Sequence, residues 1–117
     1  MFDLTKAQRI FIAVGYTDLR QGIDGFVTLV QNTFHMNPQT STLFIFCGRR
    51  SDRIKALFWD GDGYILLYKR LEDGRYQWPR TEAELKELTF QQFRWLMEGL
   101  NIYQKKVIRP VQNQLLY

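Results

Sequence analysis

The sequence contains one cysteine, Cys47, and one histidine, His35. A single cysteine excludes a disulfide bond within the chain, and the two residues together cannot supply the Cys and His ligands of a zinc site. Cys47 ends an apolar run and belongs to no cysteine-histidine motif, so we predict a buried, unreactive thiol. His35 falls in the last turn of a predicted helix, where we expect a partly exposed side chain.

The sequence also lacks a long apolar run, a signal-peptide pattern and a glycine-rich phosphate loop. A membrane span requires roughly 20 apolar residues, so we expect no membrane association and a cytoplasmic location. No Ser-His-Asp or Cys-His combination is present to activate a nucleophile. These absences predict a protein that is not an enzyme and needs no cofactor.

Three aspartates, Asp52, Asp60 and Asp62, are close enough in sequence to be considered as ligands of Mg²⁺ in a phosphoryl-transfer site. Asp60 and Asp62 alternate with glycines, however, and aspartate beside glycine is typical of a tight turn. No second cluster supplies further ligands. We favour the turn and predict no metal site.

The 117 residues suffice for one domain with its own core, and 45% hydrophobic and 24% charged residues are typical of a soluble globular protein. We assign residues 1–100 to this domain and residues 101–117 to a basic, loosely ordered C-terminal tail. The formal net charge of +4 favours a polyanionic partner.

Hydrophobic spacing predicts the secondary structure. Period-two patterns and β-branched or aromatic residues predict strands at 9–14, 42–47, 54–59, 64–71 and 75–78, with Asp-Gly turns at 60–63 and 72–74. Spacing of three and four predicts a helix over 26–34, which Asp24 caps, because two nearby glycines disfavour helix before it. Thr89 and Gln92 form a capping-box pattern for a helix over 90–98. Residues 81–88 fit either a short helix or an extended connection.

This order predicts an α+β fold, with a mainly antiparallel meander sheet of about five strands, one helix after the first strand and one near the C-terminus. We expect the helices to cover one face of the sheet. The strand at 64–71 is apolar on both faces, however, which indicates either helices on both sides or an interface with another chain.

Basic residues concentrate between Gly48 and Arg80. A loop that carries several guanidinium groups can contact successive phosphates of DNA, and a meander could bring further cations beside it. The alternative is a solvated loop with local pairs such as Asp52 with Arg53. The predicted DNA-binding residues are Arg49, Arg50, Arg53, Lys55, Lys69, Arg70 and Arg75.

Four aromatic residues lie in the same region. We predict packing roles for them, with base stacking as the alternative. They are Trp59, Tyr68, Tyr76 and Trp78.

Several strings of residues, in order along the chain, resemble the TnpB accessory protein of the insertion sequence sixty-six family of bacterial transposable elements. The resemblance covers roughly residues 9 to 100. The strings are Thr17-Asp18-Leu19-Arg20-Gln21-Gly22-Ile23-Asp24-Gly25, Leu43-Phe44-Ile45-Phe46, Gly48-Arg49-Arg50-Ser51-Asp52-Arg53-Ile54-Lys55, Trp59-Asp60-Gly61-Asp62-Gly63, Tyr68-Lys69-Arg70-Leu71 and Trp78-Pro79.

The resemblance implies a non-catalytic accessory factor for transposition, encoded beside a separate transposase. It also implies a set of motif residues whose role is unknown. Two functions fit: binding of the element ends through DNA phosphates, or docking on the transposase or on a second copy through an aromatic sheet face. The expected partners are DNA, the transposase and other products of the element. The motif residues are Asp18, Arg20, Asp24, Asp52 and Asp60.

Overall fold

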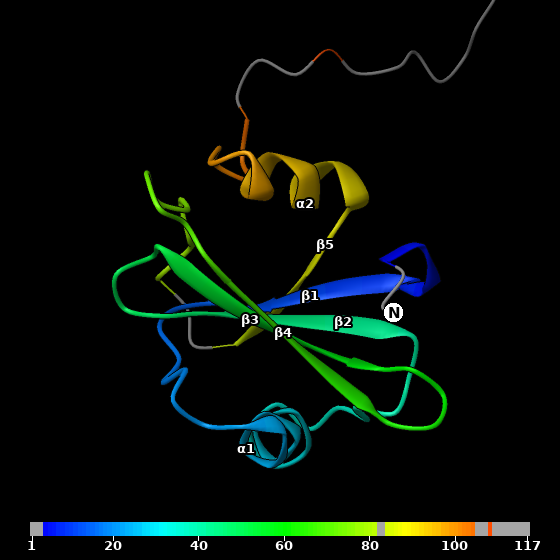
Figure 1. Cartoon of the computed structure of the whole chain (residues 1–117). Helices are drawn as coiled ribbons and strands as arrows, with labels where there is room; N and C mark the ends of the chain where they lie inside the picture. The colour runs from blue at the N-terminus through cyan, green and yellow to red at the C-terminus, as the bar shows by residue number, and fades with distance from the viewer. Residues whose placement is uncertain (1–3, 82–83, 105–107, 109–117) are drawn as a thin grey trace, which may run out of the picture.

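A five-stranded sheet lies between two helical layers, with α1 on one side and α2 on the other (Figure 1). The structure is a computed structural model that describes residues 4–81, 84–104 and 108. Its elements are η1 Leu4–Lys6, β1 Arg9–Ala13, α1 Ile23–Thr28, the π-helical turn η2 Leu29–Thr33, β2 Thr42–Cys47, β3 Arg53–Trp59, β4 Tyr64–Arg70, β5 Leu85–Leu88 and α2 Phe90–Met97.

The strands are arranged in the order β4-β3-β2-β1-β5. β2, β3 and β4 form the predicted antiparallel series, in which the loop at 48–52 joins β2 to β3 and the turn at Asp60 to Gly63 joins β3 to β4. β1 runs parallel to β2, because α1 and η2 carry the chain back across the sheet between these two strands. The sheet is therefore mixed, and the predicted simple meander is wrong for its first pair.

The strand predicted at 75–78 is absent, because the chain leaves the edge of the sheet after β4. Gly74, with φ of +84°, turns the chain across the face that carries α2. Tyr76 and Trp78 are buried in the core on that face, and Trp78 Nε1 donates to the carbonyl oxygen of Ala13 at 2.8 Å. The fifth strand is β5, which pairs antiparallel with β1.

One face of the sheet is covered by α1 and η2. Phe44 and Phe46 from β2 point to this face and pack with Phe26 and Val30. The Phe26 and Phe46 ring centroids are 4.7 Å apart. The alternation of side chains along a strand sends the neighbouring residues, such as Ile45, to the other face.

The first helix begins earlier than predicted. α1 starts at Ile23 with Gly22 at its N-cap, so Asp24 lies in the first turn and is not the cap. Gly25 is accommodated within the helix, where a Cβ atom would collide with the side chain of Gln21. The helical segment ends at Phe34 and His35, which is exposed and has a φ of 55°.

The opposite face is covered by α2 and by the crossing segment that contains Trp78. Leu96 of α2 and Ile102 are fully buried against Ile12 and Ile45. The Thr89 and Gln92 capping box is confirmed, with both of its hydrogen bonds present.

The two helices thus lie on opposite faces. The expectation that both cover one face is wrong, and the alternative drawn from the strand at 64–71, helices on both sides, is confirmed. Most of the predicted C-terminal tail, at 105–107 and 109–117, lies outside the described residues. The division of the chain at residue 100 stays a prediction.

Candidate functional site

An open groove of about 930 Å³ lies at the end of the sheet where β1 and β2 finish. It is bounded by the loop that follows β1, the loop that follows β2, and side chains of β3 and β4 on the face of the sheet that carries α1. Its lining residues are Tyr16, Thr17, Asp18, Leu19, Arg20, Gly48, Arg49, Arg50, Arg53, Lys55, Leu66 and Tyr68.

The parallel arrangement of β1 and β2 places these two loops side by side. Both strands end at the same edge of the sheet, and Thr17 N donates to the carbonyl oxygen of Cys47 at 2.9 Å. Gly48 lies so close to Leu19 that a Cβ atom on it would be 3.3 Å from the Leu19 Cδ1 atom. Two segments about 30 residues apart in sequence therefore form one wall of the groove.

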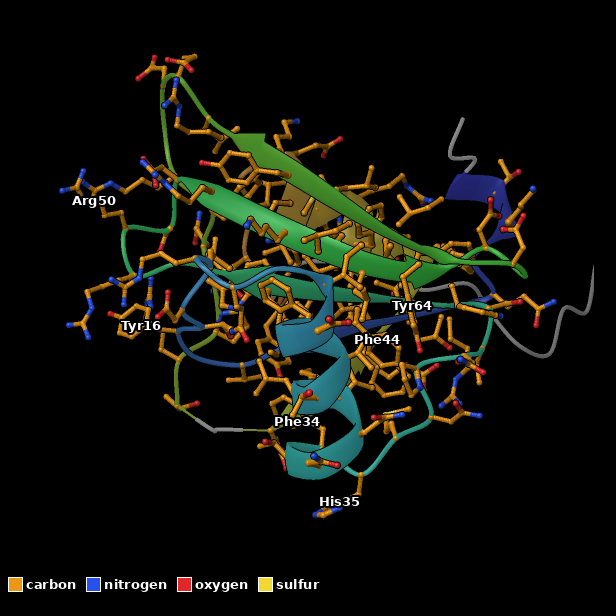
Figure 2. The ribbon with its side chains drawn as sticks, turned by 60° about the horizontal axis from the view of Figure 1, so that its bottom comes forward. Tyr16, Phe34, His35, Phe44, Arg50 and Tyr64 are labelled. Atoms are coloured by element: carbon orange, nitrogen blue, oxygen red, sulfur yellow. The ribbon has the colours of Figure 1, made fainter. Side chains whose placement is uncertain are left out.

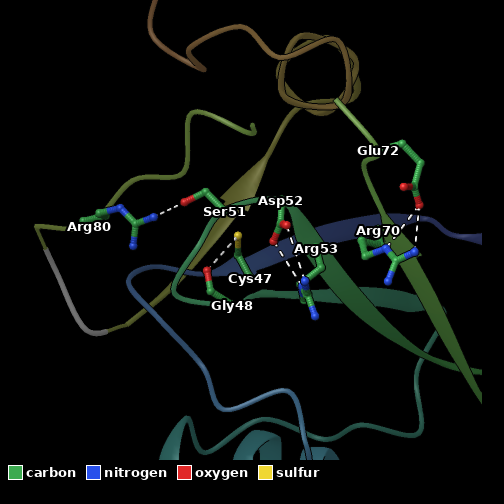
Figure 3. Close-up of polar contacts among 8 residues, drawn as sticks. All are labelled: Cys47, Gly48, Ser51, Asp52, Arg53, Arg70, Glu72 and Arg80. Atoms are coloured by element: carbon green, nitrogen blue, oxygen red, sulfur yellow. Dashed lines mark hydrogen bonds and ion pairs between the residues drawn. The ribbon is translucent and has the colours of Figure 1, made fainter. Parts of the chain in front are cut away.

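The lining is strongly cationic, with five cationic side chains against one carboxylate. The carboxylate, Asp18, accepts hydrogen bonds from Arg20, with Arg20 Nη2 and Asp18 Oδ2 2.9 Å apart. The Arg20 guanidinium lowers the pKa of Asp18 to about 2. Just outside the lining, Asp52 accepts from Arg53 Nε at 3.1 Å, which lowers the pKa of Asp52 and raises that of Arg53 (Figure 3).

Arg49 and Arg50 have no ion pair with any residue in the described part of the chain. The Arg50 side chain extends away from the body of the protein, at the same end as Tyr16 (Figure 2). Lys55 lies further inside, where its Nζ donates to the carbonyl oxygen of Gln21 at 3.3 Å. This Nζ is also 5.5 Å from the centroid of the Tyr68 ring. Arg49 and Arg50 are thus exposed in the loop between β2 and β3, and their contact with DNA stays a prediction.

Tyr16 lines the groove, although it is not among the site residues predicted from the sequence. The guanidinium carbon of Arg80 lies 3.8 Å from its ring centroid, and that of Arg49 lies 5.3 Å from it. Arg80 also donates to the hydroxyl of Ser51, whose backbone has a φ of 61° (Figure 3). The available signal was an aromatic residue directly after a strand and a glycine, in a stretch that is otherwise polar.

Three of the predicted DNA-binding residues do not line the groove. Lys69 lies on the other face of β4 from Tyr68, because successive side chains alternate. Arg70 is opposite Arg53 in the strand register but is paired with Glu72, with Arg70 Nη2 and Glu72 Oε1 2.9 Å apart (Figure 3). Arg75 is exposed in the connection after β4. Lys69 therefore does not share a rim with the loop arginines, whereas Arg70 lies beside Arg53. A DNA-binding role for these three residues stays a prediction.

The acidic motif residues are dispersed. Asp24 is exposed in the first turn of α1, and Asp60 is at the β3-β4 turn, 3.6 Å from Lys6 Nζ. Gly61 in that turn has a φ of +85°, as the predicted tight turn requires. Within residues 4–81, 84–104 and 108, no group of three or more His, Cys, Asp and Glu side chains is placed to hold a metal ion.

Cys47 ends β2 and is fully buried in the core on the face of the sheet that carries α2. Its thiol donates to the carbonyl oxygen of Gly48 at 3.5 Å. Burial raises the pKa of this thiol to about 11, which opposes formation of the reactive thiolate. The predicted burial of the thiol is confirmed, and its low reactivity stays a prediction.

Comparison with known proteins gives one family and two similar proteins. The family model described as IS66 Orf2 like protein matches residues 8–107. The uncharacterized protein y4hO of Sinorhizobium fredii (strain NBRC 101917 / NGR234) is 36% identical over 93 residues, which cover 80% of this chain and 81% of that protein. The uncharacterized protein y4jC of the same strain is 31% identical over 115 residues, 96% of this chain and 98% of that protein. No solved structure matches the chain.

None of the helices within residues 4–81 and 84–104 has the length and apolar character needed to cross a bilayer.

Proposed function

This chain belongs to the IS66 Orf2-like protein family, which confirms the resemblance noted in its sequence, and from that premise we propose a DNA-binding role. The family implies an accessory role in transposition of an insertion sequence. In this proposal the protein is a non-catalytic factor of the cytoplasm that holds DNA at the element ends and acts together with the transposase. The basic groove is its DNA-binding surface.

The observation that supports this function best is the uneven charge of the groove, with five cations to one carboxylate. Cationic side chains bind the phosphates of DNA and release condensed counterions, so binding weakens as salt rises. Arg49 and Arg50 are the strongest candidates for phosphate contacts, because no described carboxylate pairs with either. Arg20 and Arg53 already have carboxylate partners and contribute less net charge.

The alternative, docking on the transposase or a second copy through an aromatic sheet face, has less support. Tyr76 and Trp78 are buried, and Trp59 packs edge-on against Tyr64 with the ring centroids 4.9 Å apart. Of the four aromatic residues considered for that face, Tyr68 alone is exposed. Association with the transposase therefore remains part of the proposal, but through a surface other than a broad aromatic face.

The test is fluorescence anisotropy with labelled element-end and random DNA, each as duplex and as single strand, at about 50 and 200 mM salt. We expect the Arg49→Ala/Arg50→Ala double variant to bind at least tenfold more weakly. Its salt slope should decrease by about 2, since two phosphate contacts are removed. The preference among sequences should change little, because phosphate contacts carry no base information.

The matched control is Lys69→Ala/Arg75→Ala, which removes the same charge outside the groove. We expect this variant to bind nearly as the wild type does. Equal losses in the two double variants would show a general charge effect and contradict the groove as the binding site. Absence of salt-dependent binding to every DNA form would contradict the function itself.

A further inference from the structure

Two tyrosines from separate parts of the chain expose much of their surface in the groove. Tyr16 follows β1 and is 52% exposed, and Tyr68 is on β4 and is 54% exposed. Most other large aromatic residues of the sheet are buried or half-buried, including Phe44, Phe46 and Tyr64. Exposed rings in a hollow are available to a ligand that has flat apolar faces.

Each of these rings is accompanied by cations. Arg80 and Arg49 lie over Tyr16, and Lys55 lies 5.5 Å from the Tyr68 ring centroid. These contacts orient the rings, while their exposure leaves ring surface open to solvent. A ligand that stacks on the rings therefore finds positive charge immediately beside it, which suits a flat group linked to phosphates.

The helices are poorly suited to reading a duplex. α1 spans six residues, and α2 has one cationic residue, Arg94, while Leu96 packs into the core. A helix that enters the major groove needs several side chains free to reach base edges. In a duplex the base faces are also stacked on each other and cannot contact tyrosine rings.

We propose that the groove binds single-stranded DNA, with Tyr16 and Tyr68 as stacking platforms for bases and the arginines as phosphate contacts. This inference rests on the proposed DNA-binding function and specifies the form of DNA. Stacking on aromatic rings tolerates any base, because every base has a flat π-face. Sequence preference within the groove is accordingly weak.

The experiment compares binding of a single-stranded oligothymidylate with binding of a duplex of equal length. The wild type binds the single strand at least tenfold more tightly. Tyr16→Leu and Tyr68→Leu each weaken binding of the single strand by roughly tenfold, whereas Tyr16→Phe and Tyr68→Phe retain it. The control is Tyr103→Leu, which removes a 61% exposed tyrosine that does not line the groove and leaves binding unchanged.

A second measurement identifies the stacking residues directly. A single strand that contains 5-iododeoxyuridine cross-links under ultraviolet light to an aromatic ring stacked on it, and peptide mapping should locate the link at Tyr16 or Tyr68. Loss of binding through misfolding is detected by circular dichroism of each variant, and the cross-link on the wild type needs no variant at all.

The outcomes separate the two proposals. Equal binding of duplex and single strand, with the leucine variants unaffected, overturns the stacking role while leaving the DNA-binding function intact. Tighter binding of an RNA strand of the same length overturns the assignment to DNA. A cross-link outside the groove overturns the site. Failure of every nucleic acid to bind overturns both proposals.

Discussion

The guanidinium carbon of Arg80 lies 3.8 Å from the centroid of the Tyr16 ring. Arg80 is in the connection that leads to β5, and Tyr16 is in the loop that follows β1. Arg80 also donates to Ser51, in the loop that follows β2. One side chain therefore joins three segments that are distant in sequence and that together hold the groove in shape.

Replacement of Arg80 tests whether its contacts with Tyr16 and Ser51 stabilise the protein. Arg80→Ala removes the cation-π contact and the hydrogen bond to Ser51, so we expect the free energy of unfolding to fall by roughly 1–2 kcal/mol. Urea denaturation measures this change. Arg75→Ala, at an exposed position in the same connection, should change stability by less than about 0.5 kcal/mol. Equal stability of the two variants would contradict a structural role for Arg80.

The capping box of α2 gives a second prediction. Thr89→Ala removes the acceptor for Gln92 N, 3.0 Å away, and should lower the free energy of unfolding by about 1 kcal/mol. Gln91→Ala, exposed on the same helix, should be nearly neutral. Thermal or urea denaturation followed by circular dichroism compares the two. A neutral Thr89→Ala would show that packing of Leu96 alone holds the helix.

We predict that the buried thiol of Cys47 makes the folded protein lose stability at alkaline pH. Its thiol has a pKa near 9.0 when unperturbed and about 11 in the folded protein, because burial disfavours the thiolate. Below pH 9 the thiol is protonated in both states. Between pH 9 and 11 mainly the unfolded chain releases the proton, so stability falls as pH rises.

The Cys47→Ala variant isolates this effect. Its free energy of unfolding should decrease less than that of the wild type between pH 9 and 11, because it lacks the thiol. Iodoacetamide at pH 8, with mass spectrometry as the readout, should modify the wild type slowly when folded and rapidly in urea. Rapid modification of the folded protein would contradict the buried thiol.

Asp18 gives a prediction at acidic pH. The Arg20 guanidinium holds the pKa of Asp18 near 2, below its usual 3.8. Arg20→Gln should therefore raise this pKa towards 3.8, which NMR titration of the Asp18 carboxyl resonance measures. The pair stabilises the loop above about pH 4, and that contribution is lost as pH falls through 2. An unchanged pKa in the variant would show that the backbone hydrogen bond alone sets it.

Local patterns in the sequence predicted most of the elements. β1 to β4 and α2 appear within one or two residues of the expected bounds, because their hydrophobic spacing and the Thr89 cap are local signals. The prediction of a strand at 75–78 was wrong, because the alternation of Tyr76 and Trp78 is equally compatible with an extended segment that crosses the face of a sheet. The predicted start of α1 was too late, because Gly25 was expected to disfavour a helix. Its close contact with the Gln21 side chain, which leaves no room for a Cβ atom, is visible only in the structure.

The groove was predictable only in part. Arg49 and Arg50 stand in a loop between two strands, and a loop projects its side chains outward whatever the topology. The contribution of Tyr16 and Arg80 depends on β1 lying parallel to β2, which no local pattern reveals. Lys69 was grouped with the other cations by proximity in sequence, although strand alternation places it on the opposite face.

The pairing of β1 with β5 determines when the protein can complete its fold during synthesis. β1 ends at residue 13, whereas its antiparallel partner spans residues 85–88 of 117. A nascent chain therefore carries one edge of β1 without its backbone partners until residues 85–88 have been translated. Truncation before residue 85 would leave that apolar edge open to other chains, and aggregation is the expected consequence.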